Sequence, residues 1–219
     1  VGHSGSGKST FMNMLGCLDT PDSGEYFLDG KDVANLSDNE LSDIRNHKIG
    51  FIFQGFNLIP NLDALGNVEL PLIYRGLGKQ QRKEIAGEAL SKVGLENRMD
   101  HRANQLSGGQ QQRVAIARTL APEPQVLFMD EPLSNLDAKL RLEMRYELQR
   151  LHVETGSTFV YVTHDQMEAM TLATKICLIN NGVLQQYEAP LTVYSRPNNL
   201  FVADFVGNPS INFIEAKGV

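Results

Sequence analysis

The sequence predicts an α/β domain with a mainly parallel sheet and a helical insertion. Helical and strand-like segments alternate along the 219 residues, which favours parallel strands joined by helical crossovers. Two short apolar runs, 49–53 and 126–129, do not alternate like half-exposed strands and are typical of strands buried on both faces. A chain of this length can bury a substantial core in one domain.

A glycine- and serine-rich segment opens the chain and leads into a helix that we expect to reach about Leu18. Residues 2–9 read Gly-His-Ser-Gly-Ser-Gly-Lys-Ser and fit the phosphate-binding loop pattern. Glycine lets backbone N–H groups converge on one centre, and a helix N-terminus favours an anion. We expect Lys8 to reach the β- and γ-phosphates of ATP and the Ser9 hydroxyl to bind Mg²⁺. The full predicted set is Gly2, Ser4, Gly5, Ser6, Gly7, Lys8, Ser9 and Thr10. The alternative is an accidental Gly/Ser-rich turn, which would match in roughly 1% of chains this long.

Polar side chains follow both buried runs. Gln54 comes after run 49–53, and its amide oxygen can bind Mg²⁺ or an attacking water, although a solvated cap is the alternative. Asp130 and Glu131 come after run 126–129, just before Pro132, so an ordinary exposed turn is the alternative there. We assign Asp130 to the Mg²⁺ shell and Glu131 to the general base that polarises water for attack on the γ-phosphate.

Residues 106–110, Leu-Ser-Gly-Gly-Gln, precede a predicted helix from Gly109 to Leu120. Ser107 can cap this helix, and the two glycines leave backbone amides open to a ligand. A plain Ser-Gly-Gly helix start is the alternative. Further along, His164 follows the apolar run 158–162 and precedes a helix that begins at Asp165, a position where a lone histidine is usually structural.

Together, and in this order, the motifs resemble the ATPase subunit of an ATP-binding-cassette (ABC) transporter over nearly all of the chain. The resemblance implies a P-loop NTPase fold and a dimer with two ATP at the interface. Residues Ser107, Gly108, Gly109 and Gln110 would close over the γ-phosphate bound by a second ATPase subunit. Asp137, in the segment 134–137, would link the two sites. His164 would contact the γ-phosphate and help to position Glu131 and the water.

The resemblance also implies partners and a location. Transmembrane permease subunits would bind through the Gln54 loop and the helical subdomain, roughly at residues 56–75. The subunit would then lie peripherally on the cytoplasmic face of the cell membrane.

The motifs divide the chain into four segments. We expect an ATPase core at 1–53, a helical subdomain with the signature motif at 54–112, core again at 113–205, and a tail at 206–219 that leads to an absent regulatory domain. A hairpin-like stretch lies around 24–30. Ile85, Ala89 and Val93 share one face of a predicted helix at 79–93. A stripe expected in the core follows Asp137 and contains Leu140, Met144, Leu148 and Leu151.

The start of the sequence departs from the family pattern. Only Val1 is left of the strand that normally precedes the phosphate loop, and the upstream aromatic residue that stacks on adenine is missing. A sheet without that strand loses hydrogen bonds and apolar burial. We therefore expect the chain as printed to bind ATP weakly or not at all.

The two halves resemble different subfamilies. Segments 16–21, 51–60 and 67–72 are similar to lipoprotein-release and macrolide-export ATPases. Segments 130–137, 161–173 and 199–205 are similar to maltose-type sugar importers. The cargo, the direction of transport and the origin of the mixture as a recombinant, a designed hybrid or a misjoined assembly stay open.

The composition argues against several other classes of protein. A net charge of −6 argues against a general nucleic-acid binder, and no apolar run reaches the length of about 18 residues that a membrane span requires. Two cysteines are too few for a disulfide framework, and no histidines have metal-ligand spacing, so Mg²⁺ is the metal that we expect.

Two alternative functions remain. One is an ABC ATPase acting on DNA or ribosomes, which usually carries insertions that this chain lacks. The other is a catalytically weak dimerising module, which Glu131 and His164 argue against and the missing strand favours.

Overall fold

The computed structural model describes residues 1–207 and 211–212. Two compact units make up this structure. Residues Val1–Ser9 and the chain from Thr163 onward form the first, and Thr10–Val162 form the second. Most of the predicted tail at 206–219 lies outside the described residues. The predicted boundaries at residues 53, 112 and 205 do not coincide with these units and stay a prediction.

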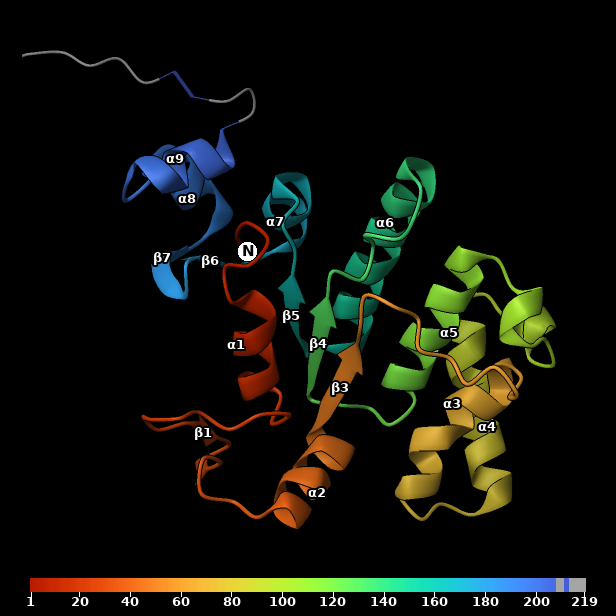
Figure 1. Ribbon diagram of the computed structural model, residues 1–219. Coiled ribbons are helices and arrows are strands. Elements are labelled where there is room, and N and C mark those ends of the chain that lie inside the picture. The colour runs from red at the N-terminus through yellow and green to blue at the C-terminus, as the bar shows by residue number, and fades with distance from the viewer. Residues whose placement is uncertain (208–210, 213–219) are drawn as a thin grey trace, which may run out of the picture. The chain divides into compact units, whose positions relative to one another are not determined.

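A three-stranded parallel sheet is the centre of the second unit. Strands β3 (Ile49–Ile52), β4 (Val126–Asp130) and β5 (Thr158–Val162) lie side by side in this order (Figure 1). The register pairs Ile52 with Met129 and Asp130 with Val162. Most residues of β3 and β4 are buried, which confirms the expected parallel sheet with strands covered on both faces.

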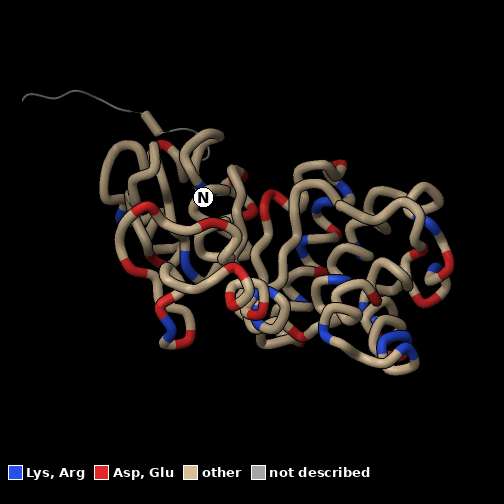
Figure 2. Tube along the Cα trace, turned by 60° about the horizontal axis from the view of Figure 1, so that its bottom comes forward, with Lys and Arg blue, Asp and Glu red and all other residues tan. Residues whose placement is uncertain are grey.

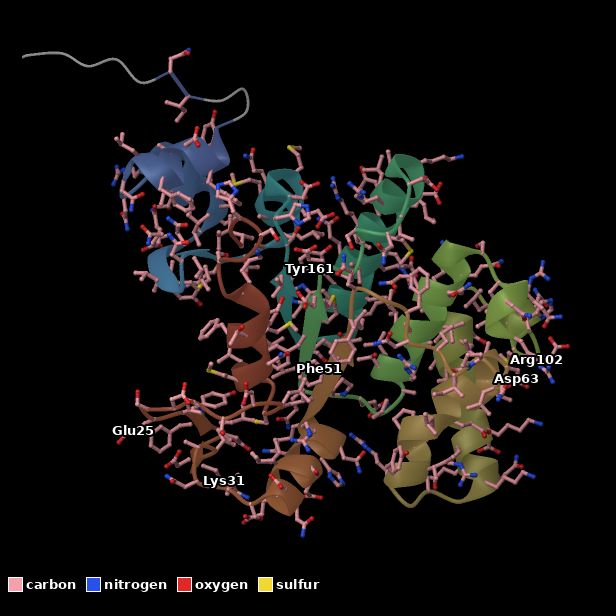
Figure 3. All side chains as sticks on the ribbon, in the orientation of Figure 1. Glu25, Lys31, Phe51, Asp63, Arg102 and Tyr161 are labelled. Carbon is pink, nitrogen blue, oxygen red and sulfur yellow. The ribbon has the colours of Figure 1, made fainter. Side chains whose placement is uncertain are left out.

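The elements before β3 cover part of this sheet. Helix α1 (Lys8–Leu15) leads to a short antiparallel hairpin, β1 (Phe27–Leu28) with β2 (Lys31–Asp32), and then to α2 (Asp38–Lys48). Their apolar side chains pack with the sheet in one cluster that includes Met12, Leu41 and Phe128. Figure 3 labels Lys31 on this hairpin and Phe51 on β3.

Helix α1 ends at Leu15, so the predicted end at Leu18 is wrong by three residues. The physical reason is a left-handed residue, Cys17, with a φ of 57°. The amide of Cys17 donates to the Met14 carbonyl at 3.0 Å, and the amide of Leu18 donates to the Asn13 carbonyl at 2.9 Å. This pair of hydrogen bonds is the Schellman motif, which satisfies the last helical carbonyls and turns the chain away from the helix.

A group of three helices follows β3. Helices α3 (Ala64–Tyr74), α4 (Lys79–Lys92) and α5 (Gly108–Leu120) pack on one another, with short 3₁₀ turns at η1 (Glu96–Arg98) and η2 (Ala103–Gln105) between the last two (Figure 1). Asp63 and Arg102, which are neighbours in Figure 3, form an isolated antiparallel bridge. The buried face of α4 contains Ala86, Ala89 and Leu90, and Val93 is also buried at its end, while Ile85 is only partly buried. The prediction is therefore right for Ala89 and Val93. The buried face also contains Ala86 and Leu90, which were not predicted, and leaves Ile85 at its margin.

Helix α6 (Ala138–Thr155) connects β4 to β5. Met144, Leu148 and Leu151 are buried, and Leu140 packs partly buried against them. The expected core stripe is thus confirmed. Gly156, with a φ of 64°, ends the helix in the left-handed conformation that favours glycine.

In its described residues, the first unit contains a two-stranded antiparallel sheet and three short helices. Strands β6 (Ile176–Asn180) and β7 (Val183–Glu188) pair with each other, and the helices are α7 (Gln166–Leu172), α8 (Pro190–Ser195) and α9 (Leu200–Val206). Its core includes Leu178, Val193, Val202 and Phe205.

Charged residues of both signs are interspersed along the described trace (Figure 2). Within the described residues, no helix has both the length and the apolar character needed to cross a membrane.

Candidate nucleotide-binding site

Both ends of the phosphate loop are fixed by backbone hydrogen bonds in the first unit. The amino group of Val1 donates to the Cys177 carbonyl at 2.6 Å, and the Ile179 amide donates to the Val1 carbonyl at 2.9 Å, which is a parallel-strand pattern along β6. At the other end, the Gly182 amide donates to the Ser6 carbonyl at 2.9 Å. The loop is therefore held against the β6–β7 hairpin before α1 begins.

The loop has glycine at positions where other residues would be strained or would not fit. A Cβ at Gly2 would lie 2.2 Å from the Ile179 carbonyl oxygen, which is backbone and cannot move aside. Gly5 and Gly7 have φ values of 77° and 90°. The glycines of the loop are thus at positions whose backbone angles or close contacts require glycine.

Two polar side chains of the loop are buried in it. Lys8 is 7% exposed, and its Nζ donates to the His3 carbonyl at 2.7 Å, so the ammonium group is turned back over the loop. The Ser6 Oγ is buried and has no hydrogen-bond partner among the described residues. A cation and a spare hydroxyl in a glycine-lined turn fit an anionic ligand such as a phosphate group.

Sequence reasoning gave no role to His3. Its ring makes edge-on contacts with Phe201 and Phe205 of α9, with centroids 5.6 Å apart in both cases. The loop is thus anchored by a helix almost 200 residues away in the sequence, and no local pattern marks that contact.

In the second unit, Gln54, Asp130 and Glu131 come at the carboxyl ends of neighbouring strands. Gln54 follows β3 by two residues, Asp130 is the last residue of β4, and Glu131 comes next. Because β3 and β4 are parallel, these side chains start from the same edge of the sheet. The positions that were predicted at the ends of the two buried runs are therefore at neighbouring strand ends within this unit.

The backbone of Glu131 is fixed in an unusual conformation. Its φ of 44° is in the left-handed region, which a residue with a side chain rarely adopts. The Glu131 amide donates to the Val162 carbonyl at 2.9 Å, and the Ser134 Oγ donates to the Glu131 carbonyl at 2.8 Å. The turn after β4 is thus held by hydrogen bonds on both sides of the strained residue.

The predicted signature motif forms the start of α5, which begins at Gly108, one residue before the prediction. Ser107 is the N-cap and forms a capping box with Gln110. Its Oγ accepts from the Gln110 amide at 3.3 Å, and the Gln110 Oε1 accepts from the Ser107 amide at 2.9 Å. The expected cap is confirmed, and Asp137 caps α6 by accepting from the Leu140 amide at 2.9 Å. The nucleotide contacts assigned to these residues stay predictions.

His164 lies in the first unit and is exposed. The residues beside it are well fixed, because the buried Thr163 Oγ1 donates to Glu168 Oε2 at 2.7 Å and accepts from the Asp165 amide at 2.9 Å. Asp165, where a helix was predicted to begin, is the N-cap of α7 and accepts from the Met167 amide at 2.7 Å. The choice between a structural histidine and a contact with the γ-phosphate stays a prediction.

The predicted site residues belong to both units. The first unit holds the loop from Gly2 to Ser9 and His164, and the second holds the others: Thr10, Gln54, Ser107, Gly108, Gly109, Gln110, Asp130, Glu131 and Asp137. Within each unit the residues are placed as described above. Their combined action on one nucleotide stays a prediction.

Comparison with known proteins gives a consistent result. A family model described as "ABC transporter" matches residues 1–134. An uncharacterised ABC transporter ATP-binding protein of Thermotoga maritima is 49% identical over 194 residues, covering 89% of this chain and 82% of the relative. A trehalose/maltose import ATP-binding protein of Thermococcus litoralis is 42% identical over 216 residues, covering 99% of this chain. The chain spans only 58% of the length of that second relative.

A solved structure matches the fold as well. It is the dimeric post-hydrolysis state of the ATP-binding cassette MJ0796 bound to ADP and Pi. The match has a TM-score of 0.77 and 46% sequence identity, and it covers 86% of this chain and 83% of the other.

Proposed function

Because the chain belongs to the family of ABC transporter ATP-binding subunits, we propose that it binds ATP with Mg²⁺ and hydrolyses it to drive transport. The observation that carries this proposal is the phosphate loop before α1. Its glycines have the required backbone geometry, and the buried Lys8 ammonium group lies over the loop. A helix N-terminus and a fixed cation together favour a triphosphate.

The side chains assigned to Mg²⁺ fit that ion. Ser9 offers a hydroxyl, Gln54 an amide oxygen and Asp130 a carboxylate, and such hard oxygen ligands are what Mg²⁺ prefers. When bound, Mg²⁺ would offset negative charge on the β- and γ-phosphate oxygens. Gln54 and Asp130 start from one edge of the sheet, which supports their sharing a ligand.

The chemistry that we assign to the protein is general-base catalysis. Glu131 would take a proton from the water that attacks the γ-phosphorus, while the bond to the β-phosphate oxygen breaks. His164 would hold the γ-phosphate and the water in line, and Lys8 would bind the phosphate oxygens. His164 is exposed and follows β5, the strand next to β4, which ends at Asp130.

Turnover requires a dimer in this proposal. Ser107, Gly108, Gly109 and Gln110 would cover the ATP bound by a second ATPase subunit, and Asp137 would link the two sites. The similarity to a cassette solved as a dimer with ADP and Pi supports this arrangement.

The permease subunits would bind at residues 56–75, on the cytoplasmic face of the membrane. Three large apolar side chains of this stretch are exposed: Ile59 by 42%, Ile73 by 47% and Tyr74 by 74%. Exposed apolar groups mark a protein-binding surface where they form a contiguous patch, and we propose that these three side chains do so when a permease binds. The cargo has two candidates, a sugar for import and a lipoprotein or macrolide-type molecule for export. The name of the trehalose/maltose import relative favours the sugar.

The test is ATP hydrolysis with Mg²⁺ by this chain and by a version in which a family-type strand precedes Val1, each with and without Glu131→Gln. We expect activity in the extended version and its loss on Glu131→Gln, with ATP binding retained. No activity in either version would contradict the proposed function and leave the dimerising module as the better interpretation. Activity that survives Glu131→Gln would contradict the role of Glu131.

A further inference from the structure

The loop that carries Gln54 is held by side chains from two separate elements of the second unit. Asn135, in the turn after β4, donates from Nδ2 to the Gln54 carbonyl at 2.9 Å. Arg118, in the last turn of α5, donates from Nη1 to the Asn57 carbonyl at 2.6 Å and from Nη2 to the Phe56 carbonyl at 3.2 Å. We propose that Arg118 and Asn135 are positioning residues, which hold the Gln54 loop in place so that the Gln54 side chain can act on Mg²⁺ or water. The inference rests on the proposed function and adds to it the residues that position Gln54.

The contacts of Arg118 are unusual for a surface arginine. In the described part of the chain its guanidinium makes no ion pair, and its hydrogen bonds go to the two loop carbonyls. The cation is partly removed from water, and this burial lowers the pKa of Arg118. A planar guanidinium can donate to two acceptors in a fixed geometry, which a lysine cannot do.

The loop is held at its far end as well. Asn57, in its middle, has a φ of 48°, in the left-handed region that asparagine adopts more readily than most residues with a side chain. On the far side of the loop the fully buried Asn67 accepts from the Ile59 amide at 2.7 Å. Residues 54–59 are therefore fixed at their start, middle and end by side chains from outside the loop.

The two positioning residues belong to segments with other predicted roles. Arg118 is on the same helix that begins at the signature residues, so α5 carries the signature at one end and this contact at the other. Asn135 lies between Glu131 and Asp137, in the turn held to the Glu131 carbonyl by Ser134. Asn135 is thus hydrogen-bonded directly to Gln54, and Arg118 to Phe56 and Asn57 in the same loop.

The test compares three variants with a matched control. Arg118→Met and Asn135→Leu remove the donors and keep side-chain bulk, and Arg118→Lys keeps the charge with a single donor group. The control is Arg82→Met, because Arg82 also donates to a backbone carbonyl, that of Leu77 at 2.7 Å, at a place away from Gln54. The extended version used to test ATP hydrolysis is the parent.

We expect kcat to fall by about 10-fold to 100-fold in Arg118→Met and Asn135→Leu, since small displacements of a catalytic group have effects of this size. The Mg²⁺ concentration for half-maximal activity should rise several-fold, while KM for ATP stays within about two-fold, because the phosphate loop is unchanged. Arg118→Lys should recover part of kcat. A fall in kcat with an unchanged Mg²⁺ requirement, or an equal effect in Arg82→Met, would overturn the proposal.

A second measurement does not depend on activity. Amide hydrogen exchange at residues 54–59 should be faster in Arg118→Met and Asn135→Leu than in the parent, and unchanged in Arg82→Met. Unchanged exchange in the first two variants would overturn the proposal. If the parent itself hydrolyses no ATP, the proposed function fails, and faster exchange would still support the ordering of this loop by Arg118 and Asn135.

Discussion

Gly109 and Leu140 approach so closely that an alanine Cβ at Gly109 would lie 2.6 Å from Leu140 Cδ2 and 2.8 Å from Cδ1. Helix α5 therefore packs near α6 at this point, and a larger residue at position 109 would displace the Leu140 side chain. Gly109 belongs to the signature motif, so this glycine has a packing role besides any contact with a nucleotide.

Gly109→Ala should lower the free energy of unfolding by about 1–3 kcal/mol, because Leu140 must move out of a packed position. The matched control is Gly87→Ala in α4, where the new Cβ would meet only the end of the Met99 side chain, at 3.7 Å. That change should raise the free energy of unfolding by about 0.5–1 kcal/mol, because alanine favours a helix. Urea denaturation measures both, and a stabilising effect of Gly109→Ala would contradict the packing argument.

Two capping boxes with a serine N-cap, both within the described residues, separate helix stability from nucleotide contact. Ser37 caps α2 with Glu40 as Ser107 caps α5 with Gln110. Each Ser→Ala change should lower the free energy of unfolding by about 0.5–2 kcal/mol, because the first turn of a helix loses its cap. In a Glu131→Gln background, size-exclusion chromatography with ATP should show loss of dimer for Ser107→Ala alone. Equal dimerisation of the two variants would remove Ser107 from the predicted interface.

Asn67 is fully buried and bonds to the backbone at several points. Besides accepting from Ile59, its Nδ2 donates to the Asp63 carbonyl at 2.9 Å, to the Ile59 carbonyl at 3.2 Å and to the Leu62 carbonyl at 3.3 Å. Asn67→Leu should lower the free energy of unfolding by about 2–4 kcal/mol, since buried backbone groups lose their partners. The control is the exposed Asn35, whose side chain bonds only to Asp32 in the described residues. Asn35→Ala should change the free energy of unfolding by less than about 0.5 kcal/mol. Thermal and urea unfolding test the difference.

Stability should fall at high pH through Tyr26. Burial raises the pKa of Tyr26 from 10.0 to about 12, and its hydroxyl donates to the Leu15 carbonyl at 2.7 Å. The folded state holds this proton more tightly than the unfolded state, so its contribution is complete below pH 10 and is lost as the pH rises towards 12. Tyr26→Phe should flatten the fall of the free energy of unfolding in this window, and should cost about 0.5–1.5 kcal/mol at neutral pH. Tyr146→Phe, at a tyrosine that is 66% exposed, should leave the slope unchanged.

The sequence was a good guide where local pattern decides the structure. The buried strands, the cap at Ser107, the helix start next to Asp165 and the stripe on α6 follow from short-range periodicity and capping chemistry, and the structure confirms them. The end of α1 was placed wrongly because a cysteine, and not the usual glycine, takes the left-handed position.

Contacts between distant segments could not be predicted in this way. The hydrogen bonds from Asn135 to Gln54 and from Arg118 to Asn57 join residues 81 and 61 positions apart, and the aromatic contacts of His3 join opposite ends of the chain. Such pairs depend on which strands are neighbours in the sheet and how helices pack, and one sequence does not reveal that order. The nucleotide contacts themselves remain predictions that rest on the motifs and the family.

Because Glu131 has a left-handed backbone, the residue that suits the proposed chemistry at this position is not the residue that gives the highest stability. A side chain in this conformation costs about 1–2 kcal/mol relative to glycine, and glycine would relieve that strain while removing the proposed base. Directed evolution for heat resistance alone, with no selection for turnover, should therefore drift towards glycine or asparagine at this position. A library selected for both properties should retain the glutamate and gain its stability elsewhere.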